Sequence, residues 1–471
     1  MFELPLLNTV RSAINNFYIN VAVWEHIPLY MLNLSINLVL FLLLLPGPLA
    51  IAYMLWQRCL FIKPQLNKPY STINIEIDKE FYKWFSGFTD AEGNFIILTL
   101  PKGFTFKFSI GLHIDDLPVL NYIKDKLGFG SVYAYKKNCY YNVTKKEDIL
   151  KIISIFETYT LNSSKRLDYL DFKKAFYLYK SRTGLSKELI NQILDLKNRM
   201  NTQRTNFKLS QFIISKSWLL GFIEGDGSFS LSKTTIDPVF SIKLTESQLP
   251  LLIEIKKYLK NNLGFDTYSM QKLNSSSIIS IGESKAVNNS KPLATLTIKN
   301  IHVLNNYFIP FFNECEFISK KGLDFNDFKI ICKAVYIGAY RVKIIKDLII
   351  KLSFTMNNFR LSTYLGTVEP MSIHEKYEII NAKATIEHLS DGRQIDIETK
   401  KLIHNRSSSS IYEIIKSSGE ILIKPNLAES AKELGIGFNT LKRQLDNQLI
   451  GYSVEYKDNK IKRIGVFQNK K

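Results

Sequence analysis

Two short stretches of the sequence end in the same arrangement, an acidic residue followed by glycine. They read WFSGFTDAEGNF at residues 84–95 and WLLGFIEGDGSF at residues 218–229. The last carboxylates of these stretches belong to Glu92 and Asp226. Carboxylate oxygens bind hard divalent cations such as Mg²⁺, and in phosphodiester cleavage such ions activate water and stabilise the leaving oxygen. If the fold brings the two acids together, the chain has the groups needed for metal-dependent phosphodiester hydrolysis.

Each stretch predicts a helix that ends at its final glycine, and small residues predict how the two helices pack. Gly87 and Ala91 are four positions apart, as are Gly221 and Gly225, so each pair lies on one helix face. Small residues at this spacing let two helix backbones approach closely. An exposed glycine inside a helix costs about 1 kcal/mol relative to alanine, so we expect the helices to need each other. We expect the glycine after each carboxylate to take the left-handed conformation that ends a helix.

The sequence around the two stretches is also repeated. LPVLNYIKDKLGFG at 117–130 matches LPLLIEIKKYLKNNLGFD at 249–266, and SKRLDYLDFKKA at 164–175 matches KKGLDFNDFKII at 320–331. The spacing between copies grows along the chain, which we attribute to a polar insertion at 271–292. Two copies of one unit predict a pseudo-symmetric pair.

Alternating residues predict strands with one core face and one polar face. Phe104, Phe106 and Phe108 alternate with polar residues, and Phe240, Ile242 and Leu244 do the same in the second copy. The alternative is that the polar face only contacts solvent. Because the pattern occurs in both halves, contact with bases and phosphates is favoured. The candidate DNA-binding residues on these faces are Thr105, Lys107, Ser109, Ser228, Ser230, Ser232 and Lys243.

Composition supports an anionic partner. Lys and Arg number 62 against 43 Asp and Glu, a net charge of +19, which favours nucleic acid or a membrane surface. No charged residue occurs from Ile27 to Gln57, a length that can span a bilayer; a buried hairpin is the alternative. The four cysteines form no C-x-x-C pair, which argues against a zinc site or a disulfide framework.

The C-terminal region has a different pattern. SSSS at 407–410 predicts a flexible joint, and 411–423 predicts a hairpin around Ser-Ser-Gly. Residues 427–447 have the spacing of a helix-turn-helix, although many helical hairpins of this kind bind nothing. In the second helix, Asn439 can read adenine while Lys442 and Arg443 face phosphate.

FSGFTDAEG at 85–93 and LLGFIEGDG at 219–227 resemble the two motifs of a single-chain LAGLIDADG homing endonuclease. Over residues 80–335 this resemblance implies an α+β fold with two αββαββα units, whose antiparallel sheets form a DNA-binding saddle. It also implies that Glu92 and Asp226 bind Mg²⁺ (or Mn²⁺) for a staggered double-strand break. A basic residue near the end of each unit matches Lys165 and Lys321, with Lys320 as a rival for the second. Glu92 departs from the usual aspartate, which allows unequal cutting of the two strands.

The resemblance also implies an origin and partners. The apolar start resembles an upstream exon of an organellar membrane protein, and the C-terminal region resembles modular DNA-binding repeats of intron-encoded nucleases. The implied protein is a mitochondrial monomer acting on double-stranded DNA, with an N-terminal segment that can contact a membrane. The alternative function is a maturase that assists splicing of group I intron RNA. The expected domains are an apolar segment at 1–69, two LAGLIDADG units at 70–205 and 206–365, a linker at 366–410 and a hairpin with helix-turn-helix at 411–471.

Overall fold

A computed structural model describes most of the chain after the apolar start. The apolar segment expected at 1–69 lies outside the described residues. None of the helices in the described part of the chain is both long and apolar enough to cross a bilayer. The described residues are 73–202, 204, 211–286, 291–403 and 409–468.

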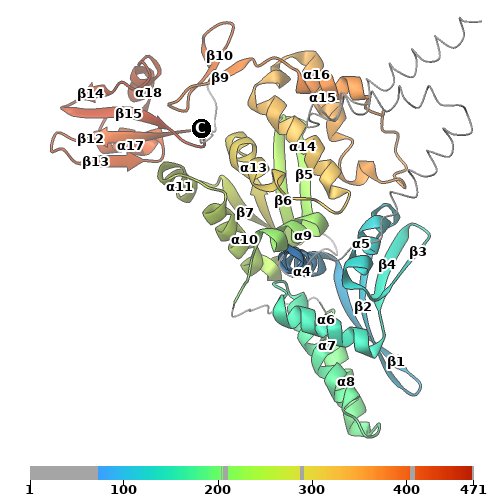
Figure 1. Ribbon diagram of the computed structural model, residues 1–471. Helices are drawn as coiled ribbons and strands as arrows, with labels where there is room; N and C mark the ends of the chain where they lie inside the picture. Colours follow the sequence, from blue (N-terminus) through green and yellow to red (C-terminus); the bar gives the residue numbers. More distant parts are fainter. Residues whose placement is uncertain (1–72, 203, 205–210, 287–290, 404–408, 469–471) are drawn as a thin grey trace, which may run out of the picture. The chain divides into compact units, whose positions relative to one another are not determined.

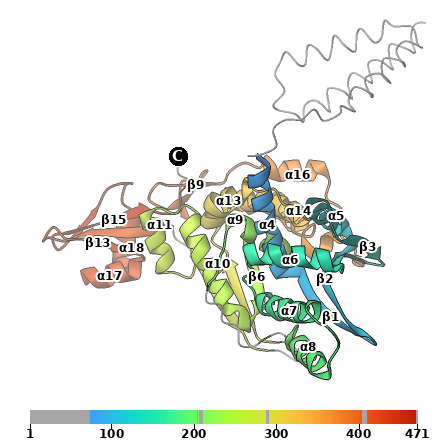
Figure 2. The same ribbon diagram turned by 60° about the horizontal axis from the view of Figure 1, so that its bottom comes forward.

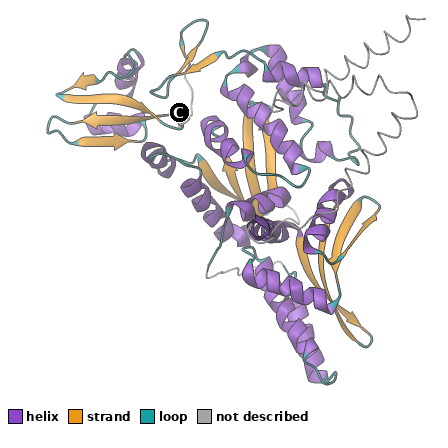
Figure 3. Ribbon diagram, in the orientation of Figure 1, coloured by secondary structure: helices purple, strands orange, loops and turns teal. Residues whose placement is uncertain are grey.

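The first repeat has the expected αββαββα order (Figures 1 and 3). Its strands form an antiparallel sheet in the order β1-β2-β4-β3. A further helix, α8, packs on α7. The elements are α4 (Ile73–Glu92), β1 (Gly93–Leu100), β2 (Gly103–His113), α5 (Leu117–Leu127), β3 (Ser131–Tyr135), β4 (Asn138–Val143), α6 (Lys146–Thr158), α7 (Lys165–Lys180) and α8 (Lys187–Arg199).

The second repeat has the same topology, with sheet order β5-β6-β8-β7. Its elements are α9 (Lys216–Asp226), β5 (Gly227–Ser232), β6 (Asp237–Thr245), α10 (Leu249–Asn262), α11 (Thr267–Asn274), β7 (Ile279–Ser284), β8 (Leu293–Ile298), α12 (Ile301–Val303), η3 (Leu304–Phe308), α13 (Ile309–Asn313), α14 (Lys321–Tyr336) and α15 (Lys343–Ser353). The extra length of this repeat is not one insertion at 271–292. It comes from α11 before β7 and from a longer β7–β8 connection, and β7 itself lies inside the range expected to be inserted.

Each sheet has one buried face, as the alternation predicts. Phe104, Phe106 and Phe108 are buried, and so are Phe240 and Ile242. In the first repeat α5, α6 and α7 contact the strands. The core therefore lies between each sheet and its own helices, which leaves the opposite sheet faces uncovered by them.

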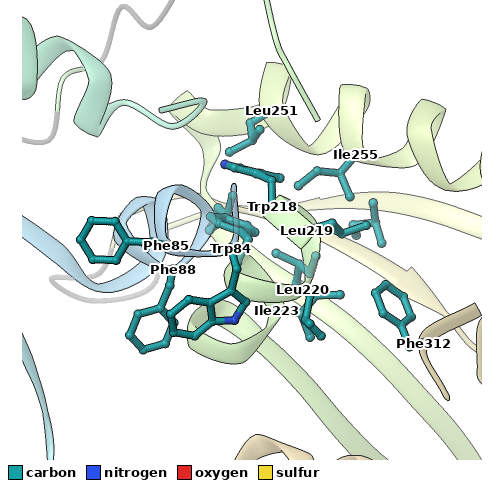
Figure 4. Close-up of a cluster of buried hydrophobic side chains, with 14 of the residues drawn as sticks. Trp84, Phe85, Phe88, Trp218, Leu219, Leu220, Ile223, Leu251, Ile255 and Phe312 are labelled. Carbon is teal, nitrogen blue, oxygen red and sulfur yellow. The ribbon is translucent and has the colours of Figure 1, made fainter. Parts of the chain in front are cut away.

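The motif helices α4 and α9 lie side by side between the two repeats (Figures 1 and 2). A Cβ atom added to Gly87 would lie 1.9 Å from the carbonyl oxygen of Trp218, and one added to Gly221 would lie 2.1 Å from that of Trp84. The two backbones therefore meet at these glycines, which confirms the predicted packing. Around the crossing, the apolar side chains of both helices form one buried cluster that includes Phe88 (Figure 4).

The glycines that follow the carboxylates do not adopt the left-handed conformation that we expected. Gly227 is extended, with φ −76° and ψ 149°, because the chain passes directly from helix into strand β5. A Cβ atom at Gly227 would lie 2.6 Å from the carbonyl oxygen of Ile223, and one at Gly93 would lie 2.8 Å from that of Thr89. Glycine is required here because the strand folds back tightly over the last turn of its own helix.

After each repeat, an arginine forms ion pairs with the two aspartates of the repeat's LD-x-x-D sequence. Arg204 pairs with Asp168 and Asp171 of α7. In the second repeat Arg360 pairs in the same way with the two acids of α14, Asp324 and Asp327. Both arginines thus hold the segment after the repeat against the helix that begins with a candidate lysine.

The C-terminal part combines the predicted hairpin and helix-turn-helix in one small fold. The sheet order β13-β12-β15-β14 adds two strands that the sequence pattern did not predict. Gly419 in the hairpin turn has φ +84°, and Gly435 between the two helices has φ +61°. The elements are β12 (Ser410–Ile415), β13 (Ile421–Lys424), α17 (Leu427–Leu434), α18 (Phe438–Asp446), β14 (Val454–Tyr456) and β15 (Asn459–Gly465).

The region expected to be a linker and flexible joint is partly ordered structure. It contains α16 (Ile373–Ile380) and the short strands β9 (Ile386–His388), β10 (Gln394–Asp396) and β11 (Leu402–Ile403). Ser409 and Ser410 of the serine run are buried, and Ser410 begins β12. Residues 404–408 lie outside the described residues.

The C-terminal fold contacts helix α11, which the first repeat lacks. Lys272 Nζ donates to the carbonyl oxygens of Ser410 at 3.0 Å and Pro425 at 2.5 Å. The backbone N–H of Phe467 donates to Ser269 Oγ at 2.9 Å. These contacts, rather than a serine tether alone, join the C-terminal fold to the second repeat.

Candidate active site

The candidate carboxylates lie together at the ends of the two motif helices. Glu92 is the last residue of α4 and Asp226 is the last residue of α9. A Cβ atom at Gly225 would lie 3.1 Å from Glu92 Cγ, so the Glu92 side chain rests against the residue before Asp226. Both side chains are partly exposed at the point where the two sheets begin. The helix crossing therefore brings together two acids that are far apart in sequence.

Partial burial raises the pKa of both carboxylates. Desolvation raises the pKa of Asp226 to about 7; the charge of Lys165 lowers this pKa and that of Glu92 raises it. Desolvation also raises the pKa of Glu92, against the opposing charge of Lys165. A bound cation would offset this desolvation cost, since an opposite charge favours the ionised form of a carboxylate.

Lysines begin α7 and α14, the equivalent helices of the two repeats. Lys165, the first residue of α7, donates through Nζ to the carbonyl oxygen of Ala91 at 2.5 Å, next to Glu92. Burial lowers the pKa of Lys165, and the charges of Asp226 and Glu92 oppose that shift. Lys321 occupies the equivalent first position of α14, and its charge lowers the pKa of both carboxylates. Lys320 Nζ instead pairs with Asp116 at 2.9 Å.

The other acids of the motifs form a crossed network that sequence reasoning missed. Trp218 of α9 donates to Asp90 of α4 at 2.9 Å, and Trp84 of α4 donates to Glu224 of α9 at 3.0 Å. Each of these acids therefore bonds to the tryptophan of the opposite motif helix. The signal in the sequence was the tryptophan that opens both motifs.

Each of these acids also holds the segment that leads to a lysine. Asp90 accepts the backbone N–H groups of Asn162 and Ser163 at 2.7 and 2.8 Å. Glu224 accepts those of Ile318, at 3.0 Å, and Ser319 in the same way. Asp90 and Glu224 are therefore committed to buried hydrogen bonds, and they set the approach of α7 and α14 to the carboxylates.

The residues present suit a divalent cation of the hard type. Within the described residues, no group of three or more His, Cys, Asp or Glu side chains could hold a metal ion. Two carboxylates and neighbouring backbone carbonyls leave most ligand positions to water and phosphate, which is how Mg²⁺ is usually held at phosphate-processing sites. The desolvated pair of acids therefore fits a cation shared with a phosphate.

Both repeats are similar to a known protein family. Residues 85–176 and 219–332 match the sequence profile of the LAGLIDADG endonucleases. The repeats belong to the LAGLIDADG endonuclease family.

Two relatives are similar to parts of the chain. An aligned region covering 39% of the chain is 32% identical to the probable intron-encoded endonuclease Cox1-I1b of Schizosaccharomyces pombe. This region covers 50% of that protein. An aligned region covering 43% of the chain is 32% identical to the mitochondrial protein RF1 of Saccharomyces cerevisiae. This region covers 43% of RF1. The chain thus spans about half the length of these relatives.

A solved structure shares the fold of the LAGLIDADG repeats. The homing endonuclease I-GzeII in complex with its DNA target is 25% identical, with a TM-score of 0.50. The match covers 59% of this chain and 99% of that one. The architecture of two pseudo-symmetric LAGLIDADG units with antiparallel sheets is therefore confirmed.

The predicted DNA-binding residues of the LAGLIDADG repeats lie on the sheet faces opposite the core. Register pairs Ser228 with Ser241, and Ser241 with Thr297, in a row of hydroxyl groups across the second sheet. In the first sheet Ser109 is buried and donates to Asn142 Oδ1 at 2.7 Å, so it supports a neighbour more than it faces solvent. Other predicted residues are partly or fully exposed on these faces, namely Thr105, Lys107, Ser230, Ser232 and Lys243.

The candidate residues of the helix-turn-helix fall into two groups. Asn439 and Arg443 are exposed on α18. Lys442 is half-buried, and its Nζ pairs with Asp446 at 2.6 Å, which opposes its expected role on phosphate. DNA binding by this part of the chain stays a prediction.

Proposed function

We propose that the chain is a site-specific homing endonuclease that cuts both strands of duplex DNA, with a divalent cation held by Glu92 and Asp226. The observation that carries the proposal is the meeting of these two acids at the helix crossing, where two uncovered sheet faces begin. The surrounding chain has a net charge of +19, which attracts the phosphate backbone. Mg²⁺ is the proposed ion, the mitochondrion the proposed compartment, and a monomer the proposed form.

In this proposal the chain's own groups position the scissile phosphates. The exposed lysine and hydroxyl groups of the two sheets bind the duplex and fix its register over the acids. When bound, a divalent cation supplies Lewis acidity and an activated water. Lys165 and Lys321, which approach the acids from α7 and α14, stabilise charge that develops on the phosphate. The Trp–carboxylate network holds these helices in place.

The direct test uses DNA that spans the uninterrupted insertion site of the chain's own intron. We expect the full chain to convert this duplex into two discrete fragments in Mg²⁺ and to leave it intact in EDTA, because the acids alone supply no activated water. Fragment ends mapped on both strands give the cut positions. Persistent cleavage in EDTA, or none in Mg²⁺ or Mn²⁺, would contradict the proposal.

The lysines give a second prediction. We expect Lys165→Ala and Lys321→Ala to slow single-turnover cleavage by about 10²–10³-fold, since a charge that stabilises the transition state is worth about 3–4 kcal/mol. DNA affinity falls much less, because one phosphate contact is a small part of a long interface. Single-turnover rates and gel-shift titrations measure the two effects.

Lys320→Ala is the matched control, because the ammonium group of Lys320 is paired with Asp116 at 2.9 Å. It should retain a rate within a few-fold of wild type. Equal losses of rate and affinity in the Lys165 and Lys321 variants would reduce both lysines to ordinary phosphate anchors.

A further inference from the structure

Strand β1 carries an apolar stripe on the uncovered face of the first sheet. Phe95 and Ile97 point into the core, so Ile96, Leu98 and Leu100 share the opposite face. Leu98 is 45% exposed and Leu100 is 49% exposed. Isolated exposed leucines are ordinary, but three successive positions on one strand face form a continuous apolar surface.

The stripe belongs to the same face as the candidate DNA-binding residues. Register places Ile96 opposite Lys107 and Leu98 opposite Thr105 of β2. Strands β1 to β4 contain no aspartate or glutamate, so no strand carboxylate on this face would repel phosphate. The strand begins directly after Glu92, so the stripe runs outward from the candidate active site.

The second repeat offers an internal comparison. Strand β5 also begins directly after its motif carboxylate, so positions can be matched by counting from Glu92 and Asp226. Ile96 then corresponds to Ser230, and Leu98 corresponds to Ser232. Equivalent positions at equal distances from the two carboxylates are aliphatic in one repeat and hydroxyl-bearing in the other.

The apolar group that a duplex presents in its major groove is the C5 methyl of thymine, whereas the other groove-edge groups that distinguish bases there are donors and acceptors. A face with lysine and hydroxyl groups and an aliphatic stripe matches phosphates, base edges and thymine methyl groups together. A protein partner would not need the lysine beside the stripe or the absence of strand carboxylates. The charge of the face thus favours DNA as the occupant.

We propose that the first repeat reads its half-site through thymine methyl groups in contact with Ile96, Leu98 and Leu100. The second repeat reads its half-site with the hydroxyl groups of Ser230 and Ser232 instead. This inference rests on the proposed endonuclease function. It adds that the two half-sites differ in kind, and that thymine methyl groups determine affinity in only one of them.

The test replaces thymine by deoxyuridine, which removes the methyl group and keeps base pairing. Two versions of the cleaved target are made, each with all thymines of one half-site replaced on both strands. We expect one version to bind the wild-type chain at least about ten-fold more weakly, since several methyl contacts are lost. The other version should bind within about two-fold of the unmodified target, since its reader makes hydrogen bonds.

A double variant, Ile96→Ser with Leu98→Ser, assigns the sensitive half-site. It should bind the sensitive version and the unmodified target equally well, because its stripe is gone. The matched control, Ser230→Ala with Ser232→Ala, alters the equivalent positions of β5 and should keep the wild-type difference. Melting curves confirm that both variants fold, as expected for substitutions on an uncovered face.

Three results would overturn the inference. The first is that the wild-type chain binds both deoxyuridine targets as tightly as the unmodified target. The second is that its binding to both is weakened equally. The third is that the Ile96/Leu98 variant still binds one deoxyuridine target more weakly than the other. Any of them leaves cleavage of the unmodified target by the wild-type chain intact. Failure of the proposed function is different, because then the unmodified target is not cut at all.

Discussion

Glu92→Gln and Asp226→Asn should each lower the rate of double-strand cleavage by at least about a thousand-fold, or about 4 kcal/mol of transition-state stabilisation. Each substitution removes a charged oxygen ligand of the proposed cation while keeping the shape of the side chain. DNA affinity should stay within a few-fold of wild type, because neither acid is assigned to base or phosphate contacts. Single-turnover cleavage on a supercoiled target, resolved into nicked and linear products, measures the effect on each strand.

The Asp226 variant should fold at least as well as the wild-type chain without metal. A carboxyl group whose pKa is raised in the folded chain adds stability below its unfolded pKa and loses it as the pH rises through the folded value. The folded pKa of Asp226 is about 7, so above that pH the ionised group opposes folding and a neutral asparagine does not. A Tm at or above that of wild type, in EDTA at pH 8, would show that lost cleavage does not reflect misfolding.

Asp90→Asn and Glu224→Gln provide the contrast within the same motifs. These acids accept buried backbone N–H groups and a tryptophan N–H, so their substitution should lower the Tm. Wild-type cleavage by either Glu92→Gln or Asp226→Asn would refute the metal assignment. So would a lower Tm that alone accounts for the lost activity.

The sequence was most informative where a pattern occurred twice. Repetition of the motif predicted both LAGLIDADG units and the meeting of Glu92 with Asp226, because two helices with small residues at one spacing have one close way to pack. It also predicted which residues of β2 and β6 face the core. Charge and spacing alone could not choose between Lys320 and Lys321. In the structure, the charge of Lys321 lowers the pKa of both carboxylates, while Lys320 pairs with Asp116.

The sequence was least informative where one segment depends on another far along the chain. The apolar run of β1 has no alternation, so the exposed stripe at Leu98 became visible only from its pairing with Thr105. The Trp84–Glu224 contact joins residues from different repeats, so the tryptophan that opens each motif does not by itself identify the acid it binds. Ser409 and Ser410 have the composition of a flexible joint, but both are buried, and Ser410 begins β12 and accepts a hydrogen bond from Lys272 of α11.

The helix crossing itself gives the prediction with the largest expected effect on stability. Gly87→Ala and Gly221→Ala should each destabilise the fold by about 3 kcal/mol or more, since the added methyl group would lie 1.9 or 2.1 Å from a main-chain carbonyl oxygen. Alanine is otherwise favoured over glycine inside a helix by about 1 kcal/mol, so the sign of the change distinguishes a close crossing from loose packing. A shift of about 5 °C or more in Tm is expected, measured by thermal melting of the full chain.

Gly184→Ala is the matched control, because a methyl group there would meet no atom within 4 Å and the backbone needs no positive φ. Its Tm should equal or slightly exceed that of wild type. A close crossing also predicts that Gly87→Ala and Gly221→Ala slow cleavage even well below their Tm, because separating α4 from α9 moves Glu92 away from Asp226. If either variant melts at or above the wild-type temperature, the two backbones do not touch at these glycines. The carboxylates would then have to be brought together by some other contact.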